Sequence, residues 1–371
     1  MALRVAIACS YLNQYGGAER VLEVVHEMYP EAPIYTSIYW PEAMPAVYRS
    51  WDIRTTFLNR WPLVKQHHQP FLPLYPIAFE RLDVQGYDVL LSVTSAFAHG
   101  IKTPPETRHI CYCLTPARFL WDYEAYVARE ALGRFARLLL PPLISRLRRW
   151  DRKAADRVDD LIAISQAVRE RIARCYGRAA EIIYPPVDVG RFYAAPQRGD
   201  YYLSAGRLIP YKRVDLAVQA FNELGLPLHI VGDGRDRTAL QAIAKPNIIF
   251  RGRLSDAELR EEFAHCRAFI FPGEEDFGIA PVEAQAAGSP VIAYAGGGAL
   301  DTVIEGVTGV FFREKSVASL IDAIRRAEQM QWDSAAIQRH AARFDTALFK
   351  RQLADYVTMA ASRHKGGTSW N

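Results

Sequence analysis

The sequence predicts an α/β protein with two doubly wound domains. Strand-like apolar runs alternate with helical patterns along the whole chain, which is typical of parallel sheets with crossover helices. The chain has 371 residues, which is long for one hydrophobic core and suits two domains of ordinary size. Because 50% of the residues are hydrophobic, both domains can bury a substantial core.

The predicted elements form two cycles separated by a proline-rich stretch. In the first cycle we expect a helix that begins near Ala18 and strands at residues 3–9, 34–39 and 89–93. In the second cycle we expect a helix over residues 212–224, ended by Gly225, and strands at residues 201–206, 228–232, 269–271 and 291–294. Pro185, Pro186 and Pro196 indicate an interdomain linker at residues 185–198. The domains are therefore predicted at residues 1–184 and 199–344, with a helix at residues 345–362 that packs back onto the first domain.

The composition limits the kinds of partner and location. A net charge of +4 permits anionic ligands but does not favour nucleic acid. The five cysteines are scattered, and Cys111 and Cys113 lack the spacing of zinc ligands, so we expect reduced thiols and no metal site. No stretch approaches the ~20 apolar residues of a membrane-spanning helix, and the N-terminal pattern is not that of a signal peptide. We expect a cytoplasmic protein, with room for peripheral association with the inner face of the cell membrane.

The most informative motif is a pair of glutamates, Glu275 and Glu283, on a predicted strand-to-helix turn. Pro272 and Gly273 end the strand, and Pro281 suits the first position of the helix that follows. Glu275 then lies in the loop and Glu283 on the first turns of the helix. In an open α/β sheet, ligands bind at the C-terminal ends of the strands. Together with the free amides at the helix start, the two carboxylates can bind a polyhydroxylated anion such as a nucleotide sugar.

Two cations follow the first strand of the second cycle. Arg207 comes directly after the strand, and Lys212 is predicted at the start of the next helix, so both would lie at the same sheet edge as Glu275. Arginine can bind phosphate oxygens in a bidentate way and lysine acts as a point charge. The pair could therefore neutralise a departing diphosphate without a metal. The alternative is a solvated helix start, because adjacent cations such as Lys212 and Arg213 are common on surfaces.

Glycine-rich turns follow two of the predicted strands. Gly16 and Gly17 precede a helix, where glycine lets a phosphate approach the backbone, although a plain turn is the alternative for so short a motif. Residues 296–298 are three consecutive glycines, which either contact a ligand or form a loop that needs positive φ. The sequence has no strand followed by Gly-x-Gly-x-x-Gly and no Walker-type Gly-Lys-Ser/Thr motif, which disfavours dinucleotide and ATP binding.

With these motifs in view, the chain resembles the retaining GT-B glycosyltransferases of family 4. The resemblance rests on Gly16 with Gly17, Arg207 with Lys212, the glutamate pair and the glycine loop, and it covers essentially the whole chain. Residues 277–284, Phe-Gly-Ile-Ala-Pro-Val-Glu-Ala, are similar to bacterial mannosyltransferases of polysaccharide assembly. The family implies two Rossmann-like domains that face a central cleft. The N-terminal domain would bind the acceptor and the C-terminal domain the nucleotide-sugar donor.

The resemblance also implies roles for individual residues. Arg207 and Lys212 would bind the diphosphate, and with Glu275, which would face the donor sugar, they are the expected catalytic residues. Glu283 would accept hydrogen bonds from the ribose hydroxyls. Further contacts with the donor are expected from Gly16, Gly17, Arg251, Gly252, Leu254, Phe277, Gly278 and Ile279. The transfer would need no metal or other cofactor and would retain the anomeric configuration.

One position departs from the family pattern. Many relatives carry a histidine directly before a Thr-Pro pair in the first domain, whereas this chain has Leu114 there. The group that activates the acceptor is therefore left unassigned. His109 lies on a predicted strand, where a core histidine is the favoured interpretation. Candidates for contacts with the acceptor or the sugar are His99, which is predicted on a loop at the cleft edge, Arg118 and Asp122.

The leading hypothesis is transfer of a hexose, mannose from GDP-mannose, to a lipid-linked or saccharide acceptor in polysaccharide or glycolipid biosynthesis. Three alternatives remain: a glycosyltransferase that uses a UDP-sugar, a nucleotide-sugar epimerase, and a non-catalytic nucleotide-sugar-binding protein. A retaining hydrolase needs two carboxylates that flank one bond. Because Glu283 is better used on the ribose, front-face attack by the acceptor is favoured over a covalent intermediate.

Two segments of the first domain combine basic residues with apolar and aromatic ones. Residues 133–158 carry seven arginines and a lysine among leucines and Trp150, and residues 57–76 carry Trp61 and Phe71 beside Arg60. Such a mixture suits an anionic bilayer surface and a lipid-linked acceptor. The alternative is an ordinary amphipathic helix whose apolar side belongs to the core.

Overall fold

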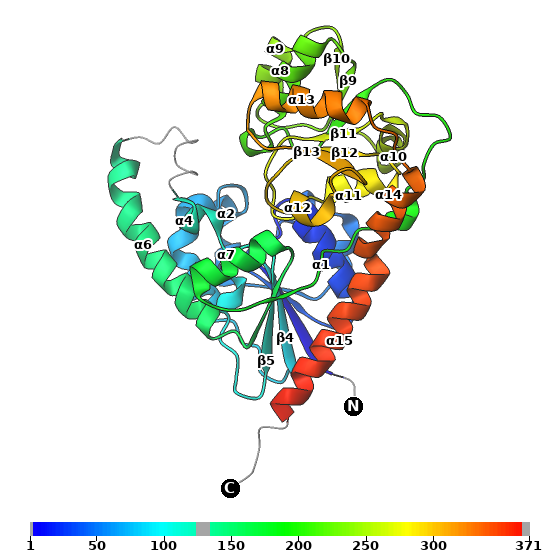
Figure 1. Cartoon of the computed structure of the whole chain (residues 1–371). Coiled ribbons are helices and arrows are strands. Elements are labelled where there is room, and N and C mark those ends of the chain that lie inside the picture. The colour runs from blue at the N-terminus through cyan, green and yellow to red at the C-terminus, as the bar shows by residue number, and fades with distance from the viewer. Residues whose placement is uncertain (1–2, 124–133, 366–371) are drawn as a thin grey trace. The chain divides into compact units, whose positions relative to one another are not determined.

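Two parallel β-sheets, each in its own structural unit, organise the chain (Figure 1). The computed structural model describes residues 3–123 and 134–365. The first unit extends to Tyr184 and resumes at Lys350, and the second spans Pro185–Phe349. Every strand pairing within the two sheets is parallel. The prediction of two doubly wound α/β domains is therefore confirmed.

The sheet of the first unit has the strand order β3-β2-β1-β4-β5-β6-β7 in the described part of the chain. Its strands are β1 (Val5–Cys9), β2 (Ile34–Thr36), β3 (Ile53–Thr55), β4 (Val89–Thr94), β5 (Arg108–Cys113), β6 (Asp160–Ala163) and β7 (Glu181–Ile182). The helices described in this unit are α1 (Gly17–Met28), α2 (Pro62–Gln66), α3 (Tyr75–Glu80), α4 (Arg118–Trp121), α6 (Arg134–Asp156), α7 (Gln166–Tyr176) and most of α15 (Thr346–Lys365).

The sheet of the second unit has the order β10-β9-β8-β11-β12-β13. Its strands are β8 (Tyr202–Ala205), β9 (Leu228–Val231), β10 (Ile248–Gly252), β11 (Phe269–Phe271), β12 (Val291–Tyr294) and β13 (Gly309–Phe312). The helices are α8 (Val214–Leu224), α9 (Arg237–Ile243), α10 (Asp256–His265), α11 (Ile279–Ala286), α12 (Ala299–Thr302), α13 (Val317–Glu328) and α14 (Ser334–Ala341). In Figure 1, α8 and α13 cover one face of this sheet, while α11 and α12 lie on the other.

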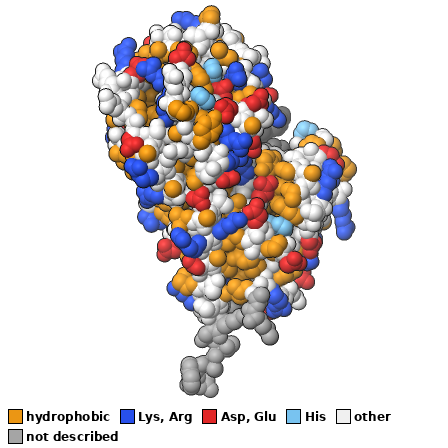
Figure 2. All heavy atoms as spheres, turned by 90° about the vertical axis from the view of Figure 1, so that its right-hand side faces the viewer, with side chains coloured by type: hydrophobic (Ala, Val, Ile, Leu, Met, Phe, Trp, Pro, Cys, Tyr) orange, Lys and Arg blue, Asp and Glu red, His pale blue; other side chains and the backbone are white. Residues whose placement is uncertain are grey.

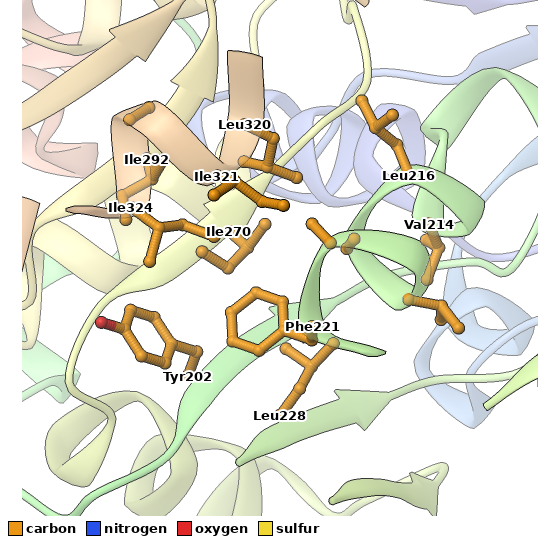
Figure 3. Packing of buried hydrophobic residues seen from close by; sticks show 14 of the residues in the cluster. Tyr202, Val214, Leu216, Phe221, Leu228, Ile270, Ile292, Leu320, Ile321 and Ile324 are labelled. Carbon is orange, nitrogen blue, oxygen red and sulfur yellow. The ribbon is translucent and has the colours of Figure 1, made fainter. Parts of the chain in front are cut away.

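The core of the second unit lies between its sheet and the helices α8 and α13. The apolar residues of α8 recur at helical spacing, so that Val214, Val218 and Phe221 all face inward. In Figure 3, Phe221 packs beside Tyr202 of β8, and Ile270 of β11 lies close to Ile321 of α13. Because this core fixes the strands, it also fixes the loops that leave their C-terminal ends.

A second core covers one face of the sheet in the first unit. It includes Tyr75 and Phe79 of α3 and Ile144 and Leu147 of α6. The apolar side of α6 therefore packs inward over its described side chains, and Trp150 donates a hydrogen bond to Glu80 Oε1 at 2.8 Å. The described part of the segment 133–158 is therefore an amphipathic helix whose apolar side belongs to the core. Residue 133 and the side chains before Leu140 lie outside the described residues.

The C-terminal helix α15 belongs to the first unit from Lys350 onward. Lys350 Nζ pairs with Glu27 Oε2 of α1 at 2.7 Å.

On the face of the molecule turned toward the viewer in Figure 2, acidic and basic side chains are interspersed. Among the described helices, none is both long enough and apolar enough to cross a membrane.

Several boundaries differ from the sequence prediction. The second strand ends at Thr36 and not at residue 39. Lys212 lies in a short 3-10 turn, Pro210–Lys212, and α8 begins only at Val214. Residues 185–198, predicted as a linker, pack within the second unit, where Val187 donates a backbone hydrogen bond to Phe344 at 2.9 Å. All five cysteines are free and buried.

Candidate active site

The candidate site lies at the C-terminal edge of the second sheet. Strand β8 ends at Ala205, and β11 beside it ends at Phe271, so the loops after both strands leave the same edge. A small hollow at this edge is lined by residues from the strand ends and from both loops, including Gly206, Arg207, Lys212, Phe271, Pro272 and Glu275. The structure therefore brings together the three residues predicted to be catalytic.

Lys212 and Glu275 form an ion pair between Nζ and Oε1. Both side chains are largely buried, with 19% and 18% of their surface exposed, so they hold each other in a partly desolvated setting. The backbone that carries Lys212 is unusual, because the next residue, Arg213, has a left-handed φ of 53°. A Cβ atom on Gly273 would lie 2.8 Å from Lys212 Cα, so only glycine lets the two loops approach this closely.

Arg207 differs from Lys212 in having no ion-pair partner among the described residues. Its side chain is exposed, directly after Gly206, whose φ of 148° is one that glycine adopts readily. An exposed guanidinium at the mouth of the hollow is available to an anionic group. Of the two cations, Lys212 is therefore fixed by its ion pair with Glu275, whereas Arg207 is exposed.

Glu283 is buried on α11, the helix after the loop. Its side chain is only 8% exposed, and its Oε1 lies 3.3 Å from Nη2 of Arg191. Arg191 ends a 3-10 turn, Val189–Arg191, in the stretch predicted as a linker. Each glutamate of the motif is therefore balanced by a cation from a different segment. Arg191 was missed because its partner lies 92 residues away and no local pattern connects them.

Helix α11 begins two residues earlier than the sequence suggested. Its first residue is Ile279, so Pro281 occupies the third position and not the first. Gly278 precedes the helix with a φ of 87°, and no side chain of the described residues caps the first turn. The N–H groups of Ile279 and Ala280 have no carbonyl within the helix to bond, and the positive end of the helix dipole adds to their attraction for an anion.

The loop of three glycines at residues 296–298 packs against the loop that carries Glu275. Gly298 N donates to the Glu275 carbonyl at 2.9 Å, and Gly297 has a φ of 60°. A Cβ atom on Gly297 would collide with the Glu275 carbonyl, and one on Gly298 would collide with the Phe277 backbone. Both glycines are therefore required by positive φ or close approach.

A second ion pair stabilises the loop that carries Glu275. Lys315 Nζ lies 2.8 Å from Glu274 Oε2 and 4.6 Å from the ring centroid of Tyr294. Glu274 follows β11, Tyr294 ends β12 and Lys315 follows β13. These contacts therefore connect the ends of three neighbouring strands. Neither Glu274 nor Lys315 was singled out in the sequence, because isolated charges near strand ends are common.

The other residues predicted to contact the donor lie in two segments, one at the end of β10 and one at the start of α1. Arg251 and Gly252 end β10, where Arg251 Nε pairs with Glu262 Oε1 at 3.2 Å and Gly252 has a φ of 69°. Leu254 is half-buried in the following loop. In the first unit, Gly16 is extended with a φ of −168° and precedes α1, whose first residue is Gly17. Within the part of the chain that the structure describes, no side chain caps that helix, and its first amides have no partners within the helix.

His99 is placed differently from the sequence prediction. It lies in a buried 3-10 turn, Ala98–Gly100, and not on an open loop at a cleft edge. Its Nε2 is 3.2 Å from Oδ1 of Asp151, whose other oxygen accepts hydrogen bonds from Trp121 and Tyr176. Burial opposes a charged imidazole, but the interaction with Asp151 outweighs it and raises the pKa of His99. Asp151 was missed because it stands in a basic stretch of sequence.

The remaining candidates lie near the C-terminal ends of β5 and β6. Leu114 directly follows β5, and Arg171 of α7 donates to Thr115 Oγ1 at 2.6 Å. Arg118 begins α4, and Asp122 follows it, 3.8 Å from Arg174 of α7. His109 is fully buried and bonded to Ser92 at 2.9 Å, as expected of a core histidine, and burial lowers its pKa to about 3.

Comparison with known families accounts for both units. Residues 15–191 match the profile described as Glycosyltransferase Family 4, and residues 191–344 match the profile of Glycosyl transferases group 1. The chain belongs to the family 4 glycosyltransferases. The two matches meet at Arg191, close to the start of the second unit at Pro185.

Relatives of this family 4 chain include mannosyltransferases. It is 32% identical over 205 residues to a GDP-mannose-dependent alpha-(1-6)-phosphatidylinositol monomannoside mannosyltransferase of Mycobacterium tuberculosis, covering 47% of this chain and 53% of the relative. It is 45% identical over 107 residues to a GDP-mannose-dependent alpha-mannosyltransferase of Mycolicibacterium smegmatis, covering 28% of each. The chain thus spans at most about half the length of these relatives.

Solved structures share the fold of this chain. HepE from Anabaena in complex with UDP-glucose superposes with a TM-score of 0.71 at 19% identity, over 96% of this chain and 100% of that one. Sucrose-phosphate synthase from Thermosynechococcus elongatus gives a TM-score of 0.70 at 17% identity, over 97% and 100%. At such identities the likeness establishes the GT-B fold alone.

Proposed function

We propose that this protein is a retaining, metal-independent glycosyltransferase that moves mannose from GDP-mannose to a lipid-linked or saccharide acceptor. The observation that carries the proposal is the pairing of Lys212 with Glu275 beside the open Arg207. The names of the mannosyltransferase relatives support mannose and GDP. In this proposal the second unit binds the donor and the first unit binds the acceptor.

The charges of the site suit the departure of a diphosphate. Breaking the anomeric C–O bond leaves positive charge on the sugar and adds negative charge to the diphosphate. Lys212, which Glu275 holds in place, and Arg207 at the mouth of the hollow would stabilise that negative charge more in the transition state than in the ground state. The uncapped amides of Ile279 and Ala280 are placed at the same strand-to-helix turn. Cations and amides would then do the work of a metal.

The two glutamates have different proposed roles. Glu275 would keep its bond to Lys212 through one carboxylate oxygen and accept hydrogen bonds from hydroxyls of the donor sugar through the other, and Glu283 would accept hydrogen bonds from the ribose. Because Glu283 is buried on α11 and paired with Arg191, it is poorly suited to act as a second carboxylate at the anomeric carbon. This favours front-face attack by the acceptor. Leu114 offers no group to activate that acceptor.

The first unit has a surface that suits a lipid-linked acceptor. Trp61 is 43% exposed and Leu63 is 69% exposed, at the start of α2, with the exposed Arg60 beside them. Residues 53–79 contain no aspartate or glutamate. Exposed apolar side chains in a positively charged segment favour contact with an anionic bilayer. We define these residues, Arg60, Trp61 and Leu63 with Lys65, as the basic-apolar tip. Location in the cytoplasm, at the inner membrane face, follows from this proposal.

The donor can be identified with a thermal-shift screen of GDP, UDP and ADP. A ligand that binds the folded state raises its stability by mass action, and we expect the largest rise in melting temperature with GDP. A larger rise with UDP would favour the UDP-sugar alternative, and no rise with any of them would overturn the donor site. Incubation with GDP-mannose then separates the classes. Released GDP indicates a transferase, an isomerised nucleotide sugar an epimerase, and unchanged donor with every acceptor tested a binding protein.

A further inference from the structure

Arg191 connects three segments of the second unit through its guanidinium. Its Nη2 lies 3.3 Å from Glu283 Oε1 on α11, and its Nη1 lies 3.3 Å from Asp256 Oδ2 at the start of α10. The guanidinium carbon also sits 5.0 Å from the ring centroid of Phe192, which is buried. Arg191 is therefore held in one orientation by a ring and two carboxylates.

The two ion pairs of Arg191 differ in their surroundings. The Asp256 side chain is 66% exposed, so water and salt screen that pair. The Glu283 side chain is almost fully enclosed, and a carboxylate in that setting needs a close cation or hydrogen-bond donor to stay charged at low cost. The contact of Arg191 with Glu283 therefore contributes more to stability than its contact with Asp256.

We infer that Arg191 is a positioning residue that orients the Glu283 carboxylate for the ribose hydroxyls of the donor. The inference rests on the proposed role of Glu283 and adds to it a residue from outside the glutamate motif. A guanidinium bound to Oε1 limits rotation of the carboxylate about its last bond, so that the group is set before the nucleotide arrives. Arg191 itself needs no contact with the donor.

This role predicts a specific pattern of kinetic effects. Ribose contacts are made equally in the ground state and in the transition state, since the ribose is remote from the bond that breaks. Loss of Arg191 therefore raises KM for the donor and leaves kcat nearly unchanged. A residue that merely maintained the fold would lower the amount of active enzyme and reduce kcat as well.

The experiment compares GDP and UDP with their 2′,3′-dideoxy forms, which lack the ribose hydroxyls. Calorimetry gives the ratio of the two dissociation constants for each base in the wild type and in the variants Glu283→Gln, Arg191→Gln and Arg191→Lys. We expect the wild type to prefer the normal nucleotide by about tenfold or more, as for hydrogen bonds to a charged group. The ratio should fall toward one in Glu283→Gln and Arg191→Gln, and Arg191→Lys should restore part of it.

The matched control is Asp256→Asn, which removes the other partner of Arg191. This variant should keep the wild-type ratio, because the enclosed pair with Glu283 remains. If Arg191→Gln weakens the normal and dideoxy nucleotides by the same factor, Arg191 does not act through the ribose and the inference is overturned. If Glu283→Gln leaves the ratio unchanged, the proposed role of Glu283 fails first and the inference fails with it. If neither GDP nor UDP binds the wild type, the donor site itself is refuted.

Discussion

Lys212 Nζ is bonded to Glu275 Oε1, so the cation proposed for the diphosphate and the carboxylate proposed for the sugar share one charge-balanced pair. The two residues come from turns after different strands, 63 residues apart in sequence. A lysine has three protons to donate. Lys212 can therefore keep one bond to Glu275 while it bonds a phosphate oxygen, which would orient the carboxylate during turnover.

Replacement of Lys212 with alanine should lower kcat by roughly 10²–10³-fold, the loss typical of removing one preorganised donor to developing negative charge. The fold should persist, because Lys212 lies in a short turn outside the cores. Release of the nucleoside diphosphate measures turnover, and circular dichroism checks the fold. The control is Lys245→Ala, which changes an exposed lysine in the loop after α9 and should keep full activity. Wild-type turnover in Lys212→Ala would remove the diphosphate role.

Alanine at Gly297 should destabilise the protein and weaken donor binding. The new Cβ would meet the Glu275 carbonyl, so the loop that carries this glutamate must shift. The matched control is Gly225→Ala, where φ is similar at 69° but a Cβ would meet no atom of the described residues within 4 Å. The control should lose only about 1–2 kcal/mol of unfolding free energy from left-handed backbone strain. Urea titrations give both values, and equal losses in the two variants would argue against the close packing of the loops.

Removal of the ion pair between Lys315 and Glu274 should have a small effect on activity. Its pair with Glu274 is partly exposed, so Lys315→Ala should lower kcat/KM by only about fivefold or less. Lys350→Ala removes a similarly exposed pair in the first unit and should leave kcat/KM unchanged. Steady-state kinetics distinguish the two. An equal loss in both variants would mean that Lys315 acts through general stability and not through the Glu275 loop.

The His99–Asp151 pair should make stability depend on pH. The pKa of His99 is raised in the folded state above its ordinary value of 6.5, so folding favours the protonated imidazole. This contribution is fully present below pH 6.5 and is lost as the pH rises through the folded pKa. Burial lowers the pKa of His109 to about 3, so His109 contributes to stability with the opposite pH dependence, in wild type and in His99→Gln.

The test measures the difference in unfolding free energy between wild type and His99→Gln across pH. We expect the unfolding free energy of the wild type to exceed that of His99→Gln by most at about pH 6 and by progressively less at higher pH. Chemical denaturation at each pH gives the difference directly. A difference that grew with pH would show that His99 is neutral in the folded protein.

The basic-apolar tip should bind anionic vesicles. We expect the wild type to sediment with vesicles that contain phosphatidylserine at low salt, and less at high salt, because the attraction to anionic lipid is screened. Leu63→Glu should reduce the bound fraction strongly. Ile243→Glu, which changes an exposed apolar residue on α9 in the second unit, should not. Absence of binding at low salt would exclude the membrane proposal.

The strands and the two-domain fold could be predicted because buried parallel strands leave continuous apolar runs in the sequence. The glutamate pair, Arg207 and Lys212 could be placed at one sheet edge by the same logic. Local backbone geometry was harder to predict. Arg213 in the left-handed region delays α8, and α11 starts ahead of Pro281, and neither follows from residue preferences alone.

The contacts of Asp151 and Arg191 could not be predicted because each depends on tertiary packing. Asp151 meets His99 across 52 residues of sequence, and Arg191 meets Glu283 across 92. In both cases a residue that looks like ordinary surface charge becomes the partner of an enclosed group. Periodicity identifies which side chains are buried, but it does not identify which charged side chains are buried together.

The packing of the glycine loop against the Glu275 loop has a consequence for protein engineering. Gly297 and Gly298 conform to the backbone of Glu275 and Phe277, so the two loops form a single module although β12 and α11 separate them in sequence. Chimeras with other members of the family should therefore exchange the segment from Pro272 to Ala299 as one block. A crossover inside it would combine loops from different parents, whose backbones have not been matched to each other.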